Sequence, residues 1–91
     1  MTRFAMLQAT QRPVDGHLVG VIASTIDQGG HAFLGVLPDG TAEPPEQFIL
    51  ATGETHLLAD GWQVRLISVT QRPSGRGKAT VEIELSAPPA D

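Results

Sequence analysis

The amino-acid sequence predicts a small all-β domain, an antiparallel β-sandwich or partly open barrel of about seven strands with little or no helix. Ten glycines and seven prolines fall between short apolar runs, as turns do between successive strands. The last of these runs alternates apolar with polar residues, which is the period of a strand with one buried face. Residues 45–53 could begin a helical turn, but they end at Gly53 and are too few for a stable helix.

The composition is that of one globular domain. The chain has 91 residues, of which 41% are apolar and 18% charged, and disorder is not expected. We predict a single β domain over residues 1–86 and a flexible proline-rich tail over residues 87–91. Because the chain contains no cysteine, disulfides, thiolate nucleophiles and thiolate metal sites are excluded.

The first strands are expected over residues 4–10, 17–26 and 31–37, the second of which is rich in valine and isoleucine. We predict that the first two form a hairpin, with Pro13 ending the pairing because proline lacks a backbone donor. A tight turn at residues 28–30 should join the second strand to the third.

Two shorter strands are expected over residues 47–51 and 55–58. The polar segment 41–46, which contains two adjacent prolines, should carry the chain from one sheet to the other. The dipeptide Asp60-Gly61 is typical of a tight hairpin turn and should lead into the next strand.

The last two strands are predicted over residues 62–70 and 78–86, as a hairpin with a longer loop between them. The final strand is expected to lie at a free sheet edge, open to strand addition or homodimerisation. One interior should be shared by the apolar residues of both strands, which are Trp62, Val64, Leu66, Ala79, Val81, Ile83 and Leu85. The far end of the first of these strands turns apolar on its second face and should be buried on both sides.

A four-residue word, Thr-Gln-Arg-Pro, occurs at residues 10–13 and again at residues 70–73. Duplication of a hairpin explains this repeat, and so does chance reuse of a good strand ending. The sequence leaves both explanations open.

Charge limits the partners. Ten acidic against six basic residues give a net charge of −4, so we expect no nucleic-acid partner. The absence of 18 consecutive apolar residues and of a signal-peptide core predicts no membrane association and a cytoplasmic protein. Three basic residues cluster in the last loop, Arg72, Arg76 and Lys78. They are either solvated or hold a carboxylate, a phosphate or an acidic partner.

No catalytic or metal site stands out. The three histidines, His17, His31 and His56, lack the close spacing of metal ligands, so we predict no metal and no cofactor. The carboxylates, among them Glu46 and Asp60, lie in or beside predicted turns and are interpreted as solvated. Trp62 is expected either to pack in the core or to line a ligand pocket together with His56 and Arg65.

Two family resemblances follow from particular residues. Gly53, His56 and Asp60 are similar in spacing to the second conserved motif of cupins, but the first cupin motif is absent, so this resemblance implies no metal-dependent reaction. From Phe48 onward the chain resembles small actinobacterial β-domain proteins of unassigned function. The residues that carry this second resemblance are Phe48, Gly53, Glu54, Gly61, Trp62, Val64, Ile67 and the alternation from Val81 to Leu85. It implies a fold and no activity.

The leading hypothesis is a non-catalytic binding or assembly module, acting through a protein partner or by self-association. The alternative is a small-molecule-binding β domain or a cofactor-independent enzyme of specialised metabolism. A host-interaction or phage-encoded inhibitor protein fits the size and acidity equally well.

Overall fold

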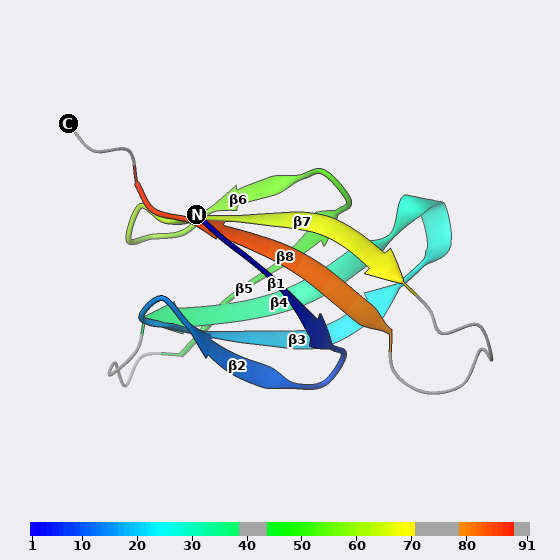
Figure 1. Cartoon of the computed structure of the whole chain (residues 1–91), viewed down its shortest axis with the longest axis horizontal. Coiled ribbons are helices and arrows are strands. Elements are labelled where there is room, and N and C mark those ends of the chain that lie inside the picture. The colour runs from blue at the N-terminus through cyan, green and yellow to red at the C-terminus, as the bar shows by residue number, and fades with distance from the viewer. Residues whose placement is uncertain (39–43, 71–78, 89–91) are drawn as a thin grey trace.

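The computed structural model describes residues 1–38, 44–70 and 79–88, apart from the side chain of Gln28, and confirms the all-β class. The described residues contain eight strands and one 3₁₀ turn, Asp27–Gly29, but no α-helix (Figure 1). The strands are β1 (Thr2–Leu7), β2 (Gln11–Val14), β3 (His17–Thr25), β4 (His31–Pro38), β5 (Glu46–Ala51), β6 (Thr55–Leu57), β7 (Gln63–Thr70) and β8 (Thr80–Ser86).

The strands form two four-stranded antiparallel sheets. Sheet A has the order β1-β8-β7-β6, and sheet B has the order β2-β3-β4-β5. The predicted shared interior is confirmed, because Val64, Leu66, Val81, Ile83 and Leu85 are all fully buried in one cluster with residues of sheet B. Trp62 is partly buried and packs against this cluster. The arrangement is a β-sandwich.

The chain passes between the sheets at two corners. At the first, the Gln8 N–H donates to the carbonyl of Ala79, just before β8 of sheet A, at 3.0 Å, and the Ala9 N–H donates to the carbonyl of Val21 in sheet B at 2.8 Å. At the second, the Thr52 N–H donates to the carbonyl of Gly30, just before β4 of sheet B, at 2.9 Å.

The second corner is completed in sheet A, where the Gly53 N–H donates to Leu66 at 2.8 Å. The pairs β1/β2 and β5/β6 are therefore bent strands that switch sheets while their backbone bonding continues. The sandwich consequently has some of the closure of a barrel.

The predicted first hairpin is wrong. β1 pairs with β8, and β3 pairs with β2. The residues of β2 were expected to belong to the hairpin loop. The β2–β3 turn is Asp15-Gly16, whose φ angles of 48° and 78° are both positive, as a type I′ turn requires. Pro13 lies within β2 and does not end the pairing there, because β2 is an edge strand in which a missing N–H can face away from the ladder.

Two further expectations are corrected. The final strand β8 is not an edge, because β1 and β7 pair with its two sides. The segment 41–46 does not lead to the other sheet, because β4 and β5 are neighbours in sheet B, with Val36 opposite Glu46. Residues 41–43 of that segment lie outside the described ranges. The other predicted hairpins, β3–β4, β6–β7 and β7–β8, are confirmed.

A β-bulge explains the change of pattern along β7. The register with β8 shifts between Leu66 and Ser68, so that Val69 lies opposite the buried Val81 and packs against the core. A one-residue shift exchanges the two faces of a strand. The far end of β7 is therefore only half-buried and was wrongly predicted to be buried on both sides.

Candidate functional site

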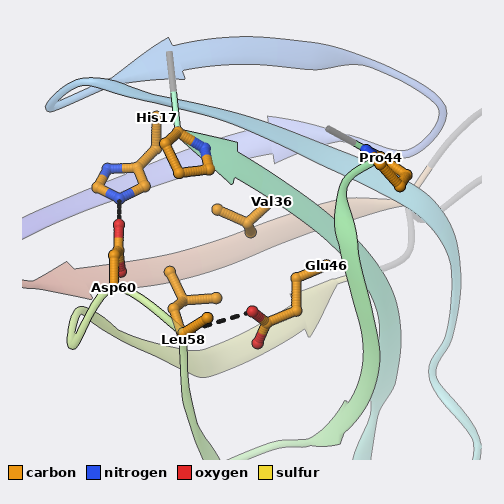
Figure 2. Close-up of a pocket in the computed structure, with 8 residues that line it drawn as sticks. His17, Val36, Pro44, Glu46, Leu58 and Asp60 are labelled. Carbon is orange, nitrogen blue, oxygen red and sulfur yellow. Dashed lines mark hydrogen bonds and ion pairs between the residues drawn. The ribbon is translucent and has the colours of Figure 1, made fainter. Parts of the chain in front are cut away.

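A cavity of about 270 Å³ lies between the two sheets, at the end of the molecule where β3 begins and the β6–β7 turn is found (Figure 2). Both sheets contribute to its walls. The apolar lining residues are Val36, Pro38, Pro44, Leu58 and Ala59, and the polar ones are His17, Glu46 and Asp60.

His17 joins sheet B to the β6–β7 turn. Its side chain is only 5% exposed, and its Nε2 lies 2.6 Å from Asp60 Oδ2, while its Nδ1 lies 3.0 Å from the carbonyl oxygen of Asp15. Both partners are acceptors when Asp60 is ionised, so both contacts are hydrogen bonds only if both ring nitrogens carry a proton. The geometry is therefore that of an imidazolium–carboxylate pair. The ring also packs edge to face with Trp62, at a centroid distance of 4.9 Å.

The surroundings of Asp60 favour its ionised form. Burial raises the pKa of this carboxyl. Hydrogen bonds from His17 and from the Trp62 N–H, together with the charge of His17, lower the pKa by more than burial raises it. The pKa of Asp60 therefore lies below its ordinary value of 3.8. Above that value, the carboxylate stabilises the folded state.

This shift predicts how an Asp60→Asn variant responds to pH. Because the folded pKa is lower than the unfolded one, the stabilisation from Asp60 is complete above the unfolded pKa and is lost as the pH falls through the folded pKa. The variant should be less stable than the wild type at about pH 6, and the difference should shrink toward about pH 2. Urea midpoints measured across this range check the expectation. A difference that stays constant with pH would contradict it.

A second histidine–carboxylate contact ties β6 to β5. His56 Nε2 lies 2.5 Å from Glu46 Oε2, and the ring stacks on Phe48 at 3.9 Å with an interplanar angle of 12°. The other oxygen of Glu46 accepts the Ala59 N–H at 3.1 Å. A neutral His56 ring with its proton on Nε2 is sufficient for this contact, and a protonated ring would make it an ion pair.

The residues predicted for a ligand pocket are not gathered in this cavity. His56 and Trp62 face the interior, whereas Arg65 is exposed on the outer side of sheet A, and none of the three lines the cavity. Arg72, Arg76 and Lys78 lie outside the described residues. Within the described residues, no three His, Cys, Asp or Glu side chains are grouped closely enough to hold a metal ion.

A second feature is the outer face of sheet B. Three apolar residues lie side by side across its strands, because Ala23 pairs with Phe33 and Phe33 pairs with Ile49. Ile22 and Ile49 are 43% and 68% exposed. We define the apolar face as Leu18, Gly20, Ile22, Ala23, Phe33, Gly35, Leu37 and Ile49.

The apolar face has two hollows. Phe33 and Ile49 line the larger one, of about 340 Å³. Gly20 and Gly35 are opposite each other in the register and form the floor of the smaller one, a trough of about 170 Å³ that Gln11 and Gln47 also line. Ile22 borders this trough, because its Cδ1 lies 3.6 Å from where a Cβ would stand at Gly35.

The two outer faces differ in charge. Sheet A presents charged residues, including Arg3, whose Nη2 lies 3.3 Å from Glu84 Oε2. Arg65 of β7 also lies opposite Glu84, on the side of β8 that faces away from β1. On the outer side of sheet B, no Asp, Glu, Lys or Arg lines either hollow of the apolar face. The fold thus separates a charged outer surface from an apolar one.

Comparisons of the chain with protein-family models, with curated proteins and with solved structures found no match. The two sequence resemblances therefore stay predictions. Among the residues that the structure covers, no helix has the length and hydrophobicity needed to cross a bilayer.

Proposed function

We propose that this protein is a non-catalytic assembly module that forms a homodimer through the apolar face of sheet B. The observation that carries the proposal is a contiguous uncharged surface with large exposed side chains, Ile22 and Ile49. Exposed apolar patches of this kind mark interaction sites. Covering them stabilises a complex by about 25 cal/mol for each Å² of apolar surface removed from water.

A second copy of the chain matches this face in charge. Burying an unpaired charge is costly, so the partner surface must also be uncharged. The chain has a net charge of −4, and its apolar face contributes none of it, so two copies can meet there without bringing like charges together at the contact. In a two-fold arrangement, the exposed Ile49 of each copy would pack against the apolar face of the other.

The size of sheet B agrees with a weak dimer. The four strands of sheet B have 4, 9, 8 and 6 residues. At about 3.3 Å per residue and about 4.8 Å per strand, they give a face of roughly 430 Å² per copy. Two such faces bury roughly 850 Å², a size typical of weak, transient interfaces, so the dimer should be reversible.

The test is the solution mass as a function of concentration. Sedimentation equilibrium over about a hundredfold range of concentration should show a monomer–dimer equilibrium for the wild type. Ile49→Asp should be monomeric throughout, because each copy would bury an unpaired carboxylate. Ile49 is mostly exposed, so the variant should keep the wild-type fold, which circular dichroism checks.

The matched control is Leu57→Asp. Leu57 is 63% exposed but lies on β6 in sheet A, away from the apolar face, so this variant should dimerise like the wild type. A wild type that stays monomeric at every concentration would overturn the proposal, and the apolar face would then be expected to bind a different protein. Equal loss of dimer in both variants would also overturn it.

A further inference from the structure

The cavity at the end of the sandwich has the size and lining of a small-molecule site. Its volume of about 270 Å³ lies close to the lower end of the range for such sites, about 300–1,000 Å³. Its walls are mostly apolar and come from both sheets, so they fit a short aliphatic group. The polar groups are few and are held in place by hydrogen bonds.

The two carboxylates of the cavity differ in how their charges are compensated. Asp60 faces His17, whose two hydrogen bonds require a positive ring. Glu46 accepts one bond from the Ala59 backbone and one from His56, and neither bond requires a positive donor. A carboxylate offers about four acceptor positions, so Glu46 can accept further hydrogen bonds.

The carboxylate of Glu46 points into the cavity. In Figure 2 its carboxylate points into the space bordered by Val36 and Leu58. None of the eight lining residues is lysine or arginine. An anion beside apolar walls attracts a cation more strongly than it would in water, because the local dielectric constant is lower.

We propose that this cavity binds a small primary alkylammonium ion, with the ammonium group on Glu46 and the alkyl group against Val36 and Leu58. An ammonium group supplies three donors and one positive charge, which match the free acceptor positions and the negative charge of the Glu46 carboxylate. The site lies between the sheets and not on the apolar face. It is therefore independent of the proposed dimerisation.

The probe is n-pentylammonium, and the matched neutral probe is 1-pentanol, which has a similar shape but no charge. Amide chemical shifts of the ¹⁵N-labelled protein should respond to the amine at Leu58 and Ala59 and should saturate. The alcohol should bind about tenfold more weakly or worse, the expected loss for an interaction with a charged group. Equal affinities for the two probes would overturn the proposal.

Glu46→Gln removes the charge while preserving the size of the side chain, and it should weaken binding of the amine about tenfold or more. The control is Glu82→Gln, which makes the same change on β8 away from the cavity lining and should bind the amine like the wild type. Unchanged affinity in Glu46→Gln, or an equal loss in both variants, would overturn the proposal.

Should Glu46→Gln fail to fold, the wild type decides the matter alone. Nuclear Overhauser effects should connect the pentyl chain to the Val36 and Leu58 methyl groups at saturation. Their absence would overturn the proposed site, whatever the oligomeric state of the protein.

Discussion

Replacing Ile83 by alanine is expected to lower the free energy of unfolding by about 2–5 kcal/mol, enough to unfold much of a small domain. Ile83 is fully buried and lies between Phe4 of β1 and Leu66 of β7 in the register of sheet A. Truncation at this position removes buried methyl groups and leaves a cavity. Because β8 is hydrogen-bonded to β1 and to β7, its backbone cannot easily move to fill that cavity. Urea unfolding gives the loss directly as a change of midpoint with an unchanged slope.

The control for this prediction is Leu57→Ala. Leu57 has a side chain of the same size but is 63% exposed on β6, so its truncation should change stability by no more than about 0.5 kcal/mol. All variants should be compared at one protein concentration, because a dimer makes the apparent stability depend on concentration. Equal losses in the two variants would show that Ile83 does not lie in a closely packed core.

Gly30→Ala should be nearly as damaging, for a reason that concerns the backbone. Gly30 is buried at the second corner with a φ of 102°, a conformation that costs an L-residue about 1–3 kcal/mol. An added Cβ would stand 2.8 Å from Thr52 Oγ1 and 3.3 Å from Val69 Cβ. Displacing Thr52 would also break its hydrogen bond to the Gly29 carbonyl, worth about 1 kcal/mol.

Gly53→Ala separates the two causes. Gly53 also has a positive φ, 90°, but a Cβ there would meet no atom within 4 Å. This variant should lose only the strain contribution and should be the more stable of the two by thermal or urea unfolding. If the two variants were equally stable, the packing at the corner beside Thr52 would contribute nothing.

The correct parts of the predicted fold came from local patterns. The alternation at Val81, Ile83 and Leu85 identified the buried face of β8. Asp60-Gly61 marked the position of the β6–β7 hairpin, but the connection is longer than the expected two-residue turn, because the Leu58 N–H donates to the Trp62 carbonyl. The errors concern pairings between distant segments. β1 was assigned to the nearest strand in sequence, yet it pairs with β8, with Thr2 opposite Leu85, because the chain must bring its first strand back to complete sheet A.

The cavity could not be predicted in the same way. His17 and Asp60 are separated by 43 positions, and each has an ordinary explanation where it stands, as a strand-end histidine and a turn carboxylate. Only the stacking of the two sheets brings them together. The apolar face left a signal that could have been used, because Ile22, Phe33 and Ile49 are large apolar residues at positions that lie on the outer side of their strands.

The sequence by itself determined the class of fold, the positions of most strands and the residues of the core, because side-chain alternation and turn chemistry act over a few neighbouring residues. The tertiary structure alone decided which strands pair, where the chain changes sheets and which polar groups meet at the cavity. Those outcomes depend on contacts between residues far apart in the chain, and no short pattern encodes which distant partner gives the lowest free energy.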